Sequence, residues 1–169
     1  MKLTDVLLAD LDREAARSKR ALEQVPEGKY DWKPHEKSMI FGYLAALVAT
    51  MPSWVTMAIT QDSLDLNPPG GSTYQMPSLR TSAELVAGHD KVVAEAKAAL
   101  SKTTDEALME PWRLLVAGNV VMETPRHVMI RDTLAHLSHH RGQMTVYLRL
   151  LGATVPALFG PSADDKRFA

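Results

Sequence analysis

Two histidines four residues apart, His136 and His140, are the side chains in this sequence best placed to do chemistry. On a helix, residues at this spacing lie one above the other on the same face. Two such imidazoles can both reach one divalent cation, as the paired histidines of helical zinc motifs do. A buried pair that is hydrogen-bonded to Gln143, to Asp132 or to water fits the same spacing, so both interpretations stay open.

Other catalytic arrangements find less support around this pair. The general base of a His-Glu-x-x-His peptidase would stand at position 137, where this sequence has Leu137. Ser138 is on the same helix without the sharp turn of a nucleophile elbow, so we do not expect a serine nucleophile. The chain has no cysteine, so any thiol in its chemistry must come from the substrate.

The helix that carries the two histidines is predicted from residue 124 to residue 151. Thr124 is its expected cap, Pro125 its first residue, and Gly152 its stop. We expect the inward face to contain both histidines in an otherwise mainly apolar stripe: Met129, Thr133, His136, His140, Met144, Tyr147 and Leu151. On the same spacing His139 lies at the edge and Arg141 faces outward.

Two amphipathic helices are expected in the first part of the chain. The first covers residues 3–25 and ends at the Pro and Gly that follow. The second begins with Ser38 as its cap and runs to residue 59. Pro52 removes a backbone donor inside it, which predicts a kink near Val48.

A third helix, a long loop and a hairpin complete the predicted elements. The run of Asn, Pro and Gly at 67–71 predicts a loop that continues to about residue 79. Thr81 and Glu84 form a capping box that opens the third helix, which runs to residue 100. Two β-prone runs in 112–123 surround a turn and predict a short hairpin. The expected fold is all-α: one domain over residues 1–169, a four-helix bundle with a β-hairpin before its last long helix.

Composition excludes some classes of partner. The formal net charge is −1 and the basic residues are spread along the chain. Nucleic acids and anionic membranes attract clustered positive charge, so we expect neither as a partner. The N-terminal segment lacks the continuous apolar stretch of a signal peptide, and no apolar run reaches membrane-spanning length. We therefore expect a cytoplasmic protein.

Three stretches of this sequence resemble the DinB-like superfamily of bacterial four-helix bundles, which includes bacillithiol-type S-transferases. They are DWKPHEKSMIFGYLAALVATMPSW from Asp31 to Trp54, HLSHHRGQMTVYLRLLG from His136 to Gly152, and VPALFGPSADD from Val155 to Asp165. Together with the helix order they span nearly the whole chain. The resemblance implies a bundle fold, a homodimer and a small-molecule substrate.

The resemblance also implies a divalent metal, often nickel or zinc, held by three histidines. His136 and His140 match the two from the fourth helix, whereas the second-helix position is Leu47, which cannot bind a metal. Either the metal is bound weakly or not at all, or another side chain replaces the lost ligand. His89 is the candidate for that role, because it interrupts the inward stripe of the third helix, although a histidine there is more often a core residue with satisfied hydrogen bonds.

The leucine at position 47, where the family has a histidine, leaves two possible functions. The first is a metal-dependent enzyme of the thiol S-transferase or hydrolase type with an incomplete site. The alternative is a non-catalytic binding or structural bundle that has lost its metal.

Overall fold

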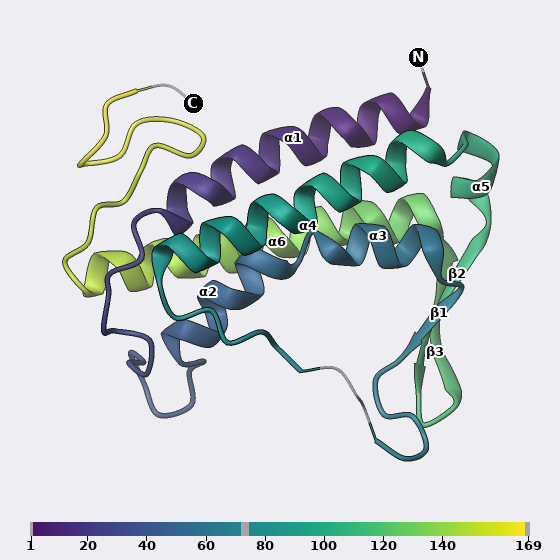
Figure 1. The fold of residues 1–169 in the computed structure, drawn as a ribbon, viewed down its shortest axis with the longest axis horizontal. Helices are drawn as coiled ribbons and strands as arrows, with labels where there is room; N and C mark the ends of the chain where they lie inside the picture. Colours follow the sequence, from purple (N-terminus) through teal and green to yellow (C-terminus); the bar gives the residue numbers. More distant parts are fainter. Residues whose placement is uncertain (1, 72–74, 168–169) are drawn as a thin grey trace.

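The computed structural model describes residues 2–71 and 75–167, and most of them are helical (Figure 1). The elements in chain order are α1 (Leu3–Leu22), α2 (Phe41–Thr50), α3 (Ser53–Thr60), β1 (Ser63–Asp65), α4 (Ser82–Lys102), α5 (Asp105–Met109), β2 (Pro111–Val116), β3 (Asn119–Pro125) and α6 (Arg126–Leu150).

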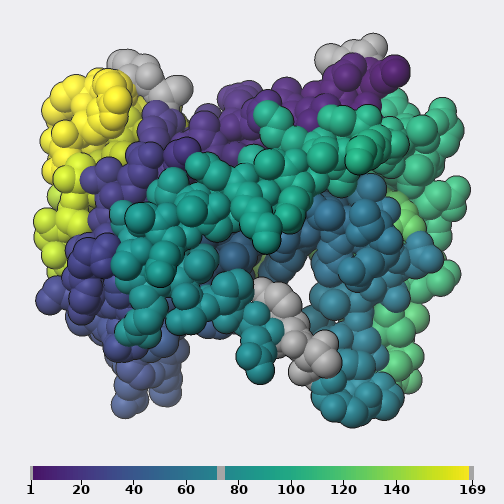
Figure 2. Space-filling view, viewed as in Figure 1, coloured from purple at the N-terminus to yellow at the C-terminus, as the bar shows by residue number. Residues whose placement is uncertain are grey.

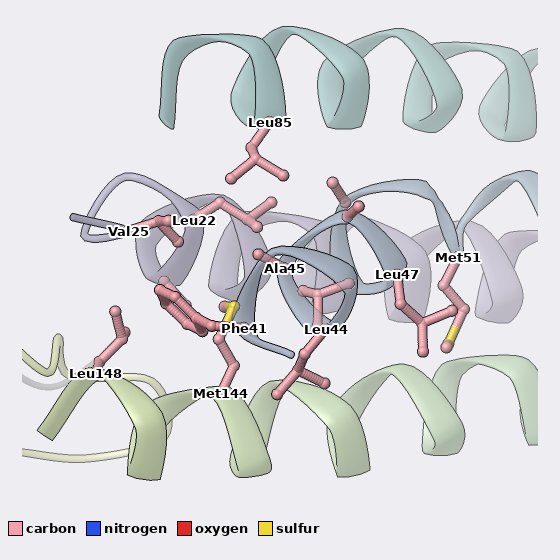
Figure 3. Close-up of a cluster of buried hydrophobic side chains, with 14 of the residues drawn as sticks. Leu22, Val25, Phe41, Leu44, Ala45, Leu47, Met51, Leu85, Met144 and Leu148 are labelled. Carbon is pink, nitrogen blue, oxygen red and sulfur yellow. The ribbon is translucent and has the colours of Figure 1, made fainter. Parts of the chain in front are cut away.

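The long helices α1, α4 and α6 run side by side, and α2 and α3 together take the place of the fourth helix of the bundle (Figure 1). Two apolar clusters fill the interior. One surrounds Phe41 and Leu44 of α2, between α4 and α6 (Figure 3). The other lies around Leu7 and Leu11 of α1, and α3, α4, α5 and α6 contribute to it. The predicted helical bundle is thus present.

The all-α expectation is confirmed only in part, because the chain also forms a small three-stranded sheet. β2 and β3 are the predicted hairpin, and β1 pairs with β2 in parallel. Strand β1 and the short helix α5 were not expected from the sequence. Asp65, the last residue of β1, accepts hydrogen bonds from the backbone N–H groups of Ala117 and Gly118, so it stabilises the hairpin turn. In the space-filling view this end of the molecule projects from the bundle (Figure 2).

The predicted second helix is two helices with 48° between them. The break is at Met51 and Pro52, a few residues beyond the predicted kink. Pro52 has no N–H to donate to the preceding turn, and its ring crowds that turn, so the helix stops and restarts in a new direction.

Ser38 is not the cap of this segment, which begins only at Phe41. The first helical N–H groups are satisfied by the preceding loop instead: Phe41 donates to the Trp32 carbonyl and Gly42 to the Tyr30 carbonyl. A Cβ at position 42 would lie 2.9 Å from the Tyr30 oxygen, so this close contact requires glycine.

The predicted ends of the other long helices are largely confirmed. Thr81 and Glu84 form the expected capping box at the start of α4, and Gly152 follows α6 with a positive φ of 72°. The prediction of Thr124 as the cap of α6 was wrong. Thr124 still belongs to β3, and the N–H of Arg126 donates to the Glu110 carbonyl instead.

Arg141 was predicted to face outward, and it is instead 1% exposed. Its guanidinium donates to the Glu14 carboxylate at 2.6 Å and to the hydroxyls of Ser18 and Ser138. The prediction was wrong because α1 packs against α6 on this side and supplies the partners that a buried charge needs.

No single helix in the described part of the chain is long and apolar enough to cross a membrane. The α2–α3 pair meets that test of length and composition only when its two bent halves are combined.

Replacing Glu14 by Ala should destabilise the protein by about 3 kcal/mol, because the buried Arg141 charge would lose its carboxylate partner. Asp12 provides a matched control on the same helix: its ion pair with Lys97 is exposed, so Asp12→Ala should cost less than about 1 kcal/mol. Urea unfolding followed by circular dichroism measures both. Equal losses in the two variants would contradict this account of the buried pair.

Candidate functional site

The imidazoles of His136 and His140 meet on α6. Their ring centroids are 4.5 Å apart and their Nε2 atoms 2.8 Å apart. His140 is buried, with 5% of its surface exposed, whereas His136 is exposed. The expectation that both point inward is therefore correct for His140 and wrong for His136. The buried stripe of α6 passes through Leu137 and Arg141, which leaves His136 at its border.

Gln143 sets the tautomer of His140. Its side-chain oxygen lies 2.7 Å from His140 Nδ1. An amide oxygen only accepts hydrogen bonds, so Nδ1 carries the proton and, in the neutral ring, Nε2 keeps its lone pair. That lone pair points to His136 Nε2. The hydrogen bond to Gln143 that was one of the arrangements expected from the sequence is thus present, and it also prepares Nε2 as a ligand atom.

Burial lowers the pKa of His136, and the neighbouring rings of His140 and His139 lower it further. The ring centroid of His139 lies 5.1 Å from that of His140 and 6.4 Å from that of His136. A lowered pKa keeps the His136 ring neutral near pH 7, which is the form that binds a cation.

His89 lies elsewhere in the interior and is only 1% exposed. Its Nδ1 is 3.1 Å from the Ala49 carbonyl oxygen, and its Nε2 is 3.1 Å from the Ala15 carbonyl oxygen. The ring therefore lies between α4, α2 and α1, and in its neutral form it donates to one of the two carbonyls. Burial lowers its pKa, against the opposing effect of the two carbonyls.

Leu47 is buried in the apolar cluster of α2, and its side chain points toward α6 (Figure 3). Within residues 2–71 and 75–167, no three His, Asp or Glu side chains are grouped closely enough to hold a metal ion. The two histidines of α6 therefore have no third protein ligand among the described residues.

Two further histidines and Asp132 lie outside the pair. His35 is exposed in the loop before α2, and His127 is half-buried on the first turn of α6. Asp132 is exposed and lines the same cavity as His136. The sequence offered Asp132 as a hydrogen-bond partner of the pair, whereas the side chain that bonds to His140 is Gln143.

A cavity beside His136 was not foreseen from the sequence. It measures about 340 Å³, and its lining includes Trp54 and Trp112. The Trp54 ring lies 5.7 Å from the His136 ring. The sequence alone does not show which residues of α3 face the sheet, so this position of Trp54 was not predicted.

Comparison with known proteins identifies the family. The model of the DinB family matches residues 1–167, and the chain belongs to this family. It is also 33% identical over 99 residues to the uncharacterized protein YrdA of Bacillus subtilis strain 168. That match covers 55% of this chain and 56% of YrdA, so it spans little more than half of either protein.

Two solved structures share the fold. A DinB-like protein from Bacillus cereus ATCC 10987 superposes with a TM-score of 0.68 at 22% identity, over 89% of this chain and 94% of that one. The DinB-like protein YjoA from Bacillus subtilis gives a TM-score of 0.66 at 17% identity, over 88% and 94%. At these identities the likeness shows the fold alone, which is that of DinB-like proteins.

The lowered pKa values of His89 and His136 predict a loss of stability in acid. The unfolded chain, with histidine pKa values near about 6.5, binds more protons than the folded chain below that pH. The unfolding free energy of chelator-treated protein should therefore fall as the pH drops through about 6.5 toward the lower folded values. Urea unfolding at several pH values tests this, with a shallower decline expected for His136→Gln. A stability that is flat or rises over this range would contradict it.

Proposed function

We propose that this protein is a metal-dependent enzyme of the thiol S-transferase or hydrolase type that holds a divalent cation, nickel or zinc, through His136 and His140. The observation that carries the proposal is the convergence of the two Nε2 atoms at 2.8 Å, with the His140 proton held on the opposite nitrogen by Gln143.

The donor atoms suit such a cation in type and in spacing. Neutral imidazole nitrogens are common ligands of nickel and zinc. Two nitrogens bound to one cation at right angles, with bonds of about 2.1 Å, stand about 3.0 Å apart, and tetrahedral bonding needs about 3.4 Å. The observed distance is close to the first value, so a small outward rotation of His136 is enough. His136 is free to make it because it is exposed.

Each side chain around the pair has a definable task. His140 is fixed by burial and by Gln143, and it anchors the site. His136 lies between the anchor and the cavity that Trp54 lines. A cation bound here supplies Lewis acidity, which lowers the pKa of a thiol or water. The thiol comes from the substrate, because the chain has no cysteine.

A non-catalytic binding or structural role is the second candidate, and Leu47 favours it. Catalytic zinc sites generally have three protein ligands and one open position, and Leu47 offers no donor where the family resemblance expects one. The hydrogen bond between the two histidines also satisfies them without a cation.

Metal analysis of protein purified without an affinity tag separates the two candidates. We expect the wild type to bind nickel or zinc, His140→Ala to lose that binding, and Gln143→Ala to weaken it by about 10- to 100-fold. His127→Ala is the control and should bind as the wild type does. Metal-free protein whose melting temperature responds to neither added metal nor chelator would support the non-catalytic role.

Restoring the third histidine provides a second test. Leu47→His should tighten nickel or zinc binding at least about tenfold, because a third imidazole would complete a three-ligand site. Leu47→Asn places a polar side chain at the same position without an imidazole, so it controls for the disturbance of the core. Titration calorimetry measures all three proteins, and equal affinities of the His and Asn variants would show that this position does not face the pair.

A further inference from the structure

The cavity beside His136 has one wall made by the sheet. Leu64, Leu114 and Met122 are direct cross-strand partners in β1, β2 and β3. Side chains that are directly opposite in neighbouring strands point to the same face of a sheet. All three line the cavity, as does Trp112, two residues before Leu114. The part of this sheet face that lines the cavity is therefore apolar.

The opposite wall comes from two helices. Trp54 and Met57 are three apart on α3, and Met129, Thr133 and His136 follow one another at helical spacing on α6. The bend at Pro52 and the start of α6 directly after β3 bring these two faces to the sheet. The cavity therefore lies at a junction of three elements, and Leu66 is exposed at its edge.

Apart from the two indole rings, the polar side chains of the lining are few and belong to α6. The charged or titratable residues of the lining are Asp132 and His136, and no Lys or Arg is among them. Because the Asp132 carboxylate is not accompanied by a cation in the lining, it repels a phosphate or another strongly anionic ligand. In addition, the indole N–H of the buried Trp112 has no hydrogen-bond partner among the described residues.

The volume limits the size of an occupant. About 340 Å³ is near the lower end of small-molecule sites, which measure about 300 to 1,000 Å³ and are mainly apolar with a few polar groups. One or two aromatic rings or a branched alkyl group suit this space better than a nucleotide or a peptide.

We propose that this cavity binds a small, uncharged, apolar molecule, with an aromatic ring or a branched alkyl body between α3 and the sheet and its polar group directed at His136. That the bound molecule is the substrate rests on the proposed function, and the cavity then defines the class of that substrate. The cavity itself requires no metal to bind the apolar body.

The neutral solvatochromic dye prodan, added to chelator-treated protein, tests the binding. Its emission should shift to the blue and saturate at one dye per chain. Met122→Trp and Met57→Trp fill the cavity from opposite walls, and each should weaken binding at least about tenfold. Val121→Trp is the matched control, because Val121 is 57% exposed on the same strand as Met122 and is not among the lining residues; it should bind within about twofold of wild type.

Competition defines the ligand class. Benzyl alcohol should displace the dye at concentrations at which ethylene glycol and inorganic phosphate do not. Dye binding that both filling variants retain, or equal competition by the three compounds, would overturn the proposal. Dye binding that disappears as the protein dimerises, measured by sedimentation, would assign the cavity to a second copy of the chain and would also overturn it.

The dye experiment tests the apolar cavity separately from metal binding. The dye titration is made on chelator-treated protein, so its result does not depend on bound nickel or zinc. If the dye binds but no nickel or zinc does, the proposed enzyme fails and the apolar site stands. If metal binds but the dye does not, the apolar site fails and the proposed metal site stands.

Discussion

The missing backbone donor of Pro52 is the constraint on which the arrangement of the site depends. A continuous helix from Phe41 to Thr60 would run straight along the bundle. The break instead gives two short helices at 48°. α2 then packs into the cluster around Phe41, and α3 contributes Val55 and Ala58 to the other. Trp54 follows the break by two residues and lies 5.7 Å from the His136 ring, so a local backbone property shapes one side of the site.

Buried polar groups link the helices in the middle of the bundle. Between its two apolar clusters, α1 carries Glu14 and Ser18, and both bind Arg141 of α6. On the other side, the His89 ring lies between the carbonyl oxygens of Ala15 and Ala49, and its neutral form donates to one of them. Unpaired polar groups at these positions would cost several kcal/mol each, so the pairing restricts how the helices can rotate. The rotation of α6 buries His140 and leaves His136 at the border of the cavity.

The position of the histidine pair on that border bears on both proposals. His140 is held from behind by Gln143, while His136 reaches toward the apolar space between α3 and the sheet. A reacting group bound at the pair would have an apolar chamber beside it. At Leu47 the chain departs from the three-histidine pattern of the family that its sequence resembles. The strength of metal binding is therefore the property that separates the two candidate functions, an enzyme and a binding protein.

Much of this could be predicted from the sequence, because it depends on neighbours within a few residues. The long helices, the capping box of Thr81 and Glu84, the stop at Gly152 and the hairpin around Gly118 follow from local hydrogen bonding and backbone preference. The spacing of His136 and His140 also follows from helix geometry alone. The motifs around them were specific enough to indicate the family.

Only the tertiary structure decided which faces meet. Arginine is usually a surface residue. Arg141 is buried because α1, more than a hundred residues earlier in the chain, supplies Glu14 as its partner. Strand β1 is three residues long and is defined by its pairing with β2, which no local pattern specifies. The caps of α2 and α6 are likewise backbone carbonyls from other segments. The sequence by itself determined the helices and the histidine pair, and long-range packing decided their rotation, the burial of each histidine and the cavity beside them.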